Sequence, residues 1–314
     1  MVASNAHVSI AIRSLMAIVS KGETMKYTNE TNLPDPVVRA LTFFQKDEKV
    51  EGLRVTTLID APQISQIKKT KEWRKQATAD VKDLGWLMQG SAMHLVLEQA
   101  NVDSNSYESE ERLSVKVNGT LISGAVDLQH LDDDAVDLFD YKQTGVFKII
   151  YGDYREWTNQ LNVYAYLVRK CKKRVVRSVS VVAMLRDWKA TEADRKSDYP
   201  PASILTIPLT LWSDEEQDAY VRERVRLHKM AETTAKLGTL PECTDEERWA
   251  KPAQYAVMKG DNKRALRVFD TQQEADAYAK KDSTRHVEIR AATYIRCANN
   301  YCGVAEFCNQ WKER

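Results

Sequence analysis

The sequence is short of glycine and proline, with 11 and 8 of these residues among 314. So low a content argues against a loop-rich all-β protein. No apolar run approaches the roughly 18–20 residues that a membrane-spanning helix requires. An excess of charge is lacking too, since 46 basic and 45 acidic residues leave a net charge of +1. The chain as a whole therefore has no electrostatic attraction to nucleic acid, and any such binding must come from local basic patches.

The rest of the composition, with 43% hydrophobic and 29% charged residues, is typical of a folded globular protein. It excludes a disordered or fibrous chain. A length of 314 residues allows one large domain or two modest ones. We expect a dispensable extension over residues 1–24, because Met25 would serve as a start, then a core over 25–240 and a smaller module over 241–314.

Hydrophobic periodicity predicts an α/β core. Helices are expected at 34–46, 63–80, 84–100 and 154–172, strands at 53–59, 111–117, 120–127, 135–142 and 177–185, and turns at 118–119 and 132–134. Ser213 begins a capping box, so a further helix is expected over 213–237. Short strands around a helix then predict a small ββαβ module before the last cysteines.

Two aspartates and a lysine are the strongest candidates for catalytic residues. Asp140 and Lys142 lie two residues apart on one predicted strand and share a face, and Asp127 ends the neighbouring strand. Carboxylates bind hard divalent cations, and such a cation polarises a phosphoryl oxygen and lowers the pKa of bound water. A lysine beside them can orient that water and stabilise developing negative charge. The alternative is a pair of exposed strand-end acids with a lysine nearby.

Two predicted helices add polar pairs at a spacing of four residues. His94 and Glu98 share one face of the helix at 84–100, where the histidine can bind a metal and the glutamate a metal-bound water. Gln160 and Tyr164 share one face of the helix that follows the lysine strand. Each of these residues alone also fits a structural role in the core or at the surface.

In this order, the residues resemble the RecB-type branch of the PD-(D/E)xK nuclease superfamily. That branch carries a glycine, a histidine and a glutamate on a helix, then Gly-x-x-Asp, then Asp/Glu-x-Lys, and finally Gln-x-x-x-Tyr. The matching residues are Gly90, His94, Glu98, Gly124, Asp127, Asp140, Lys142, Gln160 and Tyr164. The match covers about residues 90–165, and its strength lies in the order and short spacing of motifs that are each weak alone.

The resemblance implies a restriction-endonuclease-like core, a mixed central sheet flanked by helices, that hydrolyses phosphodiester bonds. The implied ligands of Mg²⁺ or Mn²⁺ are His94, Asp127, Asp140 and the carbonyl of Tyr141. Lys142 would position the attacking water. Gln160 and Tyr164 would brace the site and contact DNA.

The five cysteines are an odd number in a chain too long to need disulfide bonds. Cys297, Cys302 and Cys308 fall within twelve residues, which indicates a reducing compartment and a metal or cluster site. They resemble the C-terminal trio of those nucleases of this branch that bind a 4Fe-4S cluster. Their fourth cysteine precedes the nuclease core, whereas here Cys243 is the candidate and Cys171 a bystander. Four thiolates also suit structural zinc, and free thiols are the third alternative.

Two clusters of basic residues are candidates for binding the DNA backbone. They are Lys68, Lys69 and Lys71, and Lys172, Lys173 and Arg174. Together they could flank a groove for phosphates. A charged helix face that contacts only solvent would explain the first cluster as well.

The expected function is therefore that of a metal-dependent deoxyribonuclease, an exonuclease of phage-type recombination or DNA processing in the cytoplasm of a bacterium or phage-infected cell. Its expected partners are DNA and a single-strand annealing protein or helicase, with no membrane. The alternatives are a non-catalytic DNA-binding subunit and a partner-binding protein, each retaining the nuclease fold. The complete set of two aspartates and a lysine favours the enzyme.

Overall fold

The structure, a computed structural model, describes residues 26–43, 51–101, 104–299 and 301–313. The extension expected over 1–24 lies outside the described residues. None of the helices in the described ranges has the length and apolarity to cross a membrane.

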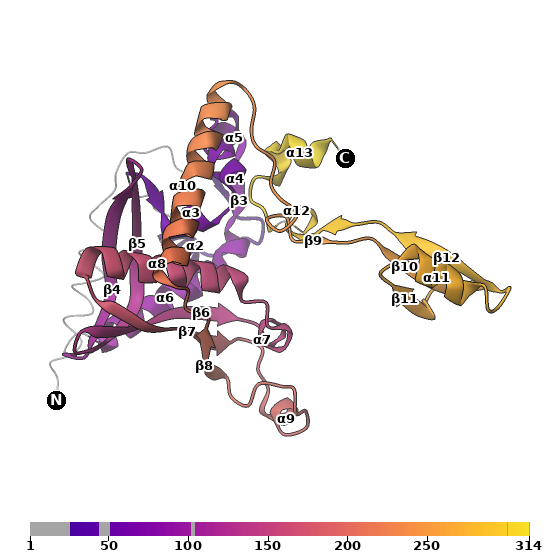
Figure 1. The fold of residues 1–314 in the computed structure, drawn as a ribbon, viewed down its shortest axis with the longest axis horizontal. Coiled ribbons are helices and arrows are strands. Elements are labelled where there is room, and N and C mark those ends of the chain that lie inside the picture. The colour runs from indigo at the N-terminus through magenta and orange to yellow at the C-terminus, as the bar shows by residue number, and fades with distance from the viewer. Residues whose placement is uncertain (1–25, 44–50, 102–103, 300, 314) are drawn as a thin grey trace.

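A six-stranded mixed sheet forms the centre of the protein (Figure 1). Its strands are β2 (Leu53–Arg54), β4 (Tyr107–Val117), β5 (Thr120–Asp132), β6 (Ala135–Thr144), β7 (Val175–Leu185) and β8 (Ile204–Leu209). The strand order is β2-β5-β6-β7-β8, with β4 paired to β5. β4, β5 and β6 form an antiparallel meander, β6 and β7 are parallel, and β8 is antiparallel to β7. The prediction of an α/β fold with a mixed sheet is confirmed.

Two tight turns set the register of the meander. Asn118 and Gly119 have positive φ angles of 49° and 79°, as a two-residue hairpin turn requires, and Val117 pairs with Thr120 across them. The second turn connects β5 to β6, where Asp132 pairs with Ala135. Both turns agree with the sequence prediction.

Strand β5 changes neighbours along one of its edges. β4 pairs with β5 along almost its full length, so β2 and β6 share the opposite edge. β2 pairs with Ile122 and Ser123, whereas β6 pairs only from Leu128 onwards. The sheet therefore forks beside Asp127, because β5 and β6 part there.

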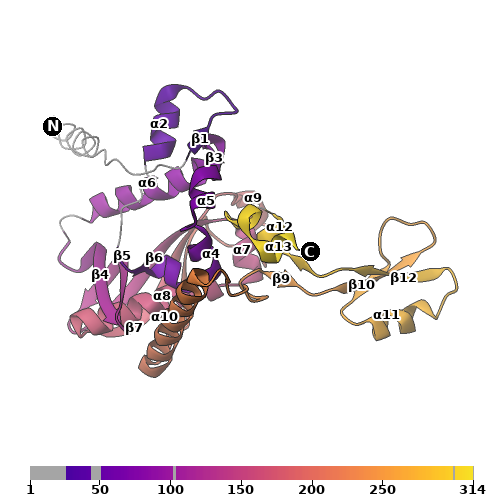
Figure 2. The same ribbon diagram turned by 90° about the horizontal axis from the view of Figure 1, so that it is seen from above.

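Helices cover the sheet and supply side chains to the fork. The longer ones are α6 (Gly85–Ala100), α8 (Arg155–Lys172) and α10 (Asp214–Lys236). Ten residues of α8 are buried, and α10 begins with the predicted capping box of Ser213 and Glu216. In Figure 2, β4 and β5 lie between α6 and α10. α6 has no buried residue, so it lies on the sheet surface rather than in the core.

Two predicted elements are wrong in part. Only Leu53–Arg54 of the strand predicted at 53–59 is extended, and Val55–Ile59 forms helix α3. A short apolar run fits either structure, and here the helical spacing of Val55 and Leu58 places both side chains in the core. The helix predicted at 63–80 is interrupted, because Thr70 caps a new helix.

The remaining elements are short. They are β1 (Lys26–Thr28), α2 (Asp35–Phe43), α4 (Pro62–Ile67), α5 (Lys71–Gln76), β3 (Thr78–Asp80), η1 (Val81–Leu84), α7 (Val146–Tyr151), α9 (Ala190–Ala193), α12 (Ile295–Ala298), η2 (Ala305–Phe307) and α13 (Asn309–Lys312). β1 pairs in parallel with β3 to form a separate two-stranded sheet.

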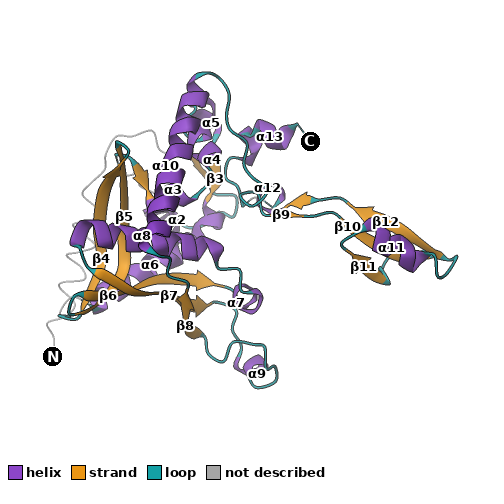
Figure 3. Cartoon of the chain, viewed as in Figure 1, coloured by secondary structure: helices purple, strands orange, loops and turns teal. Residues whose placement is uncertain are grey.

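A small module projects from this core (Figures 1 and 3). It consists of β10 (Gln254–Lys259), β11 (Arg267–Phe269), α11 (Gln272–Ala279) and β12 (Arg285–Arg290). The strand order is β11-β10-β12, and the ββαβ sequence of elements agrees with the prediction. A two-stranded neck of β9 (Ala250–Lys251) and β13 (Thr293–Tyr294) connects the module to the core.

Candidate functional site

The two candidate carboxylates lie where the sheet forks. Both aspartates are buried, with 7% of Asp127 and 1% of Asp140 exposed. Asp127 and Asp140 would be the next opposed pair after Leu128 and Phe139, but pairing stops before them. Instead of a ladder bond, the backbone N–H of Tyr141 donates to Asp127 Oδ2 at 2.8 Å. This bond anchors the Asp127 carboxylate beside the Tyr141 backbone.

Helix α8 connects the other candidate residues in one hydrogen-bonded chain. The Gln160 amide donates to Asp140 Oδ1 at 2.8 Å and accepts from Lys142 Nζ at 3.1 Å. Lys142 Nζ also lies 2.6 Å from Asp140 Oδ2. The same Gln160 nitrogen lies 3.3 Å from the Tyr164 hydroxyl. As expected, Asp140 and Lys142 share one face of their strand, and Gln160 and Tyr164 share one face of their helix. The four side chains meet around the Asp140 carboxylate.

Gly124 allows Tyr164 to reach this position. A Cβ atom at Gly124 would lie 2.6 Å from Tyr164 Cε1 and 2.7 Å from Val55 Cγ2. Both distances are far below van der Waals contact, so only glycine fits without a shift. Gly90 differs, because a Cβ there would meet nothing within 4 Å. The two glycines of the motif therefore have different structural roles.

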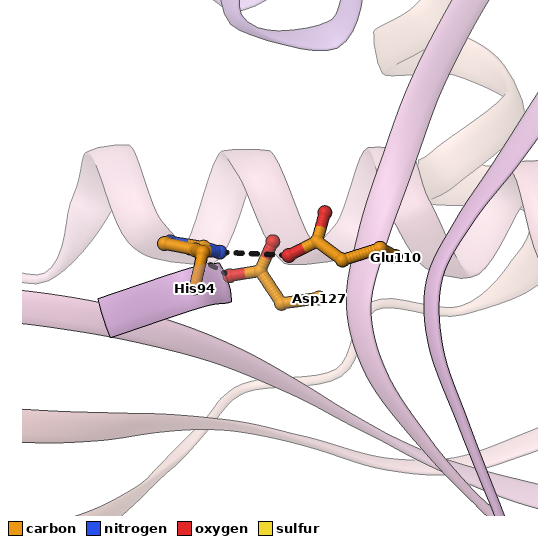
Figure 4. A group of neighbouring side chains, drawn as sticks. All are labelled: His94, Glu110 and Asp127. Atoms are coloured by element: carbon orange, nitrogen blue, oxygen red, sulfur yellow. Dashed lines mark hydrogen bonds and ion pairs between the residues drawn. The ribbon is translucent and has the colours of Figure 1, made fainter. Parts of the chain in front are cut away.

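His94 approaches Asp127 from helix α6, together with a residue that the motifs do not include (Figure 4). His94 Nδ1 lies 2.8 Å from Glu110 Oε1, and His94 Nε2 lies 3.8 Å from Asp127 Oδ2. Glu110 belongs to β4, directly across from Asp127 in the register. Counting back from the 118–119 turn would have found it, because a two-residue turn fixes which residues face each other.

The three side chains in Figure 4 could hold a metal ion. One ligand atom from each of His94, Glu110 and Asp127 lies within 4.8 Å of the other two. Within the described ranges, no other three metal-ligating side chains are grouped as closely. An imidazole with carboxylates suits divalent cations such as Mn²⁺, and the carboxylates also suit Mg²⁺. Of the expected ligands, His94 and Asp127 belong to this group and suit the expected ion, whereas Asp140 lies outside it.

The electrostatics of the site favour such a cation. Burial, reinforced by the negative charge of Asp140, raises the pKa of Asp127 to about 7. The hydrogen bond to Glu110 raises the pKa of His94. The site contains three carboxyl groups and only two cationic partners. The carboxyl groups are those of Glu110, Asp127 and Asp140, and the cationic partners are Lys142 and His94. A divalent cation would relieve the repulsion between these carboxylates.

An open cleft of about 510 Å³ gives access to the site from α6. Its lining includes His94, Glu98, Glu110, Tyr141 and Gln143. Glu98 is exposed and lies in this lining rather than in the bonded cluster. Solvent and a ligand can therefore reach His94 and Glu110, whereas Asp140 stays buried beneath them.

The structure also brings four cysteines together. Cys243, Cys297, Cys302 and Cys308 line one small cavity of about 20 Å³, and none forms a disulfide. Gln63 Oε1 accepts from the thiols of Cys243 and Cys308 at 3.0 and 3.5 Å. Burial raises the pKa of Cys243 to about 12. Cys171 lies apart on α8, where its thiol donates to the Ser114 carbonyl.

The two basic clusters differ in their contacts. Lys68, Lys69 and Lys71 are exposed around the junction of α4 and α5. In the second cluster, Lys172 Nζ lies 2.5 Å from Glu108 and 2.7 Å from Glu111, so its charge is already paired. Its neighbour Lys173 is exposed, and Arg174 is half-buried.

Comparison with known proteins finds distant structural likeness only. No family model matches the chain, and no curated protein has a similar sequence. The crystal structure of SSO0001 is 15% identical, with a TM-score of 0.42 over 61% of this chain and 84% of that one. LHK-Exo in complex with dAMP is 10% identical, with a TM-score of 0.32 over 59% of this chain and 94% of its own. A protein of Eubacterium rectale that carries the provisional name exonuclease is 11% identical, with a TM-score of 0.26 over 74% and 85%.

Proposed function

We propose that the protein is a metal-dependent deoxyribonuclease that hydrolyses DNA phosphodiester bonds. The observation that carries the proposal is the position of Asp127, Asp140 and Lys142 at the fork of the sheet. Two buried carboxylates and a lysine that lies 2.6 Å from one of them form a site suited to phosphoryl chemistry. We further propose that it acts as an exonuclease in recombination or DNA processing, with a single-strand annealing protein or a helicase as partner.

His94, Asp127, Asp140 and the Tyr141 carbonyl would hold Mg²⁺ or Mn²⁺. When bound, this ion would polarise the phosphoryl oxygen and acidify a water. Lys142 would orient the attacking water and stabilise the charge that develops on phosphate oxygen. Gln160 holds the side chains of Lys142 and Asp140 in place through hydrogen bonds, and the hydroxyl of the buried Tyr164 contacts the Gln160 amide. Glu98, in the cleft lining, would bind a water at the edge of the site.

The test is cleavage of labelled linear DNA, single- and double-stranded, with Mg²⁺ or Mn²⁺ and with chelator. Asp127→Asn, Asp140→Asn and Lys142→Ala should each lose cleavage, the lysine variant by about 100- to 1,000-fold. Lys116→Ala is the matched control, because Lys116 is an exposed lysine on the same sheet. Full activity of Lys142→Ala would refute the assignment. Tight DNA binding without cleavage by the wild type would support the non-catalytic alternative.

We propose that the four cysteines hold a 4Fe-4S cluster, with structural zinc as the alternative. Zinc at about 2.3 Å from each thiolate in a tetrahedron needs sulfurs about 3.8 Å apart. In the described part of the chain, no three thiols lie within 4.8 Å of one another. Iron and zinc analysis of anaerobically purified protein decides between them. Absence of both metals would leave the cysteines as free thiols.

A further inference from the structure

We propose that Glu110 is a positioning residue that fixes the tautomer of His94 and directs His94 Nε2 towards Asp127. The inference rests on the proposed function, because it concerns how the metal-binding histidine is oriented. It adds a residue on β4 to a site otherwise built from α6, β5, β6 and α8.

The two ring nitrogens of His94 face different groups. Nδ1 lies 2.8 Å from Glu110 Oε1, and Nε2 lies 3.8 Å from Asp127 Oδ2. An ionised carboxylate can only accept a hydrogen bond, so Nδ1 must carry the proton that Glu110 accepts. In the neutral ring, Nε2 then carries the lone pair, and this nitrogen is the one that faces Asp127. Histidines that bind metals commonly donate their other N–H to a carboxylate in this way.

The other glutamates of β4 have a different environment. Glu108 and Glu111 both pair with Lys172, and Gln129 also donates to Glu111 at 2.6 Å. Glu110 has His94 as its partner and no lysine or arginine among the ion pairs of the described residues. A nearby lysine therefore neutralises Glu108 and Glu111, but it does not account for the position of Glu110.

The backbone of β4 is distorted at Glu110. Residues three apart on a regular strand point to opposite faces, yet Glu108 and Glu111 reach the same lysine. The cause is Glu110 itself, whose φ angle of 51° lies in the left-handed region that a non-glycine residue rarely adopts. Pairing with β5 continues at Ser109 and at Glu111, so the distortion is confined to this residue.

This contact has two consequences for metal binding. It holds the imidazole ring in one orientation, and the negative charge of Glu110 makes His94 a stronger electron donor. Replacing such a carboxylate partner typically lowers metal affinity about 10- to 100-fold. Glu110→Ala should do so, whereas Glu110→Gln should retain much of the affinity, because its amide oxygen still accepts the Nδ1 proton.

The experiment measures two quantities that do not depend on catalysis. The ¹⁵N NMR shifts of the His94 ring in metal-free protein report its tautomer, and electron paramagnetic resonance of free Mn²⁺ reports affinity. The wild type and Glu110→Gln should show the Nδ1–H form, and Glu110→Ala should lose that preference along with Mn²⁺ affinity. Glu111→Gln is the matched control and should behave as wild type in both measurements.

Each failure has a distinct meaning. An unchanged tautomer and unchanged Mn²⁺ affinity in Glu110→Ala would overturn the inference and leave the proposed function standing. A loss of affinity in Glu110→Gln as large as in Asp127→Asn would also overturn it, since Glu110 would then be a ligand itself. A wild type that binds no Mn²⁺ would refute the proposed function and, with it, this role for Glu110.

Discussion

Gly124→Ala is expected to destabilise the protein because the added methyl group has no room. It would lie 2.6 Å from Tyr164 Cε1 and 2.7 Å from Val55 Cγ2. Neither neighbour can move into solvent, since Tyr164 is 6% and Val55 is 1% exposed. Inserting a methyl group into a well-packed core typically costs about 1–3 kcal/mol. We expect a loss in this range in the free energy of unfolding.

The same substitution should weaken the candidate site. Relief of the clash requires Tyr164 to shift, and its hydroxyl lies 3.3 Å from the Gln160 amide that holds Asp140. A shift on α8 is therefore transmitted to the carboxylate. The rate of DNA cleavage should therefore fall, and the fall should be larger than the small loss expected from the unfolded fraction of the variant.

Urea unfolding followed by tryptophan fluorescence measures the stability change. Gly90→Ala is the matched control, because nothing lies within 4 Å of its added Cβ and its position is inside helix α6. That variant should gain about 0.5–1 kcal/mol from the reduced freedom of the unfolded chain. Val55→Ala should relieve part of the cost of Gly124→Ala. Equal stability of wild type and Gly124→Ala would refute the packing argument.

Three further predictions concern other parts of the chain. Asp137→Asn should reduce the free energy of unfolding at neutral pH but not in acid, because the hydrogen bond from Arg177 holds the pKa of Asp137 below its unfolded value of 3.8. The ionised carboxylate therefore stabilises the fold above that pH, and this stabilisation is lost as the pH falls. Urea unfolding at several pH values measures the difference. Cys308→Ser should lower the melting temperature more than Cys171→Ser, since Cys308 is buried among the grouped thiols and Cys171 is exposed. Charge reversal of the exposed lysines at 68, 69 and 71 should reduce the salt slope of DNA binding by roughly one unit per lost phosphate contact, and an unchanged slope would mean that they contact only solvent.

Much of the central meander could be predicted from the sequence, because its turns leave little freedom. Two-residue turns at 118–119 and 133–134 place Glu110, Asp127 and Asp140 in one row across three strands. Motif spacing finds the two aspartates but not Glu110, since the motifs describe positions along the chain rather than across the sheet. Register counting would have supplied the missing residue.

Other features depend on tertiary contacts that local sequence does not contain. Four of the five residues in Val55–Ile59 are β-branched, which favours a strand, but packing against α8 makes the segment helical. Likewise, the contact of Gln63 with two cysteines joins residues that are 180 and 245 positions apart in the chain. No periodicity reveals such a contact.

The ionised carboxylate of Asp127 should destabilise the folded protein. Burial and the charge of Asp140 raise its pKa to about 7, above the unfolded value of 3.8. The folded protein therefore binds this proton more tightly than the unfolded chain, and stability falls as the pH rises from about 4 to 7. At about 1.4 kcal/mol per pKa unit, the loss above pH 7 is at most about 4 kcal/mol.

Asp127→Asn removes this charge while its side-chain oxygen can still accept from the Tyr141 N–H. In the presence of chelator, the variant should be more stable than wild type near pH 8, and the difference should vanish near pH 4. Urea unfolding at the two pH values measures it, and Asp132→Asn, an exposed aspartate of the same strand, is the control. A variant that is less stable than wild type at pH 8 would contradict the reasoning. A more stable but inactive variant would mean that the fold keeps two repelling carboxylates at the fork because catalysis needs them there.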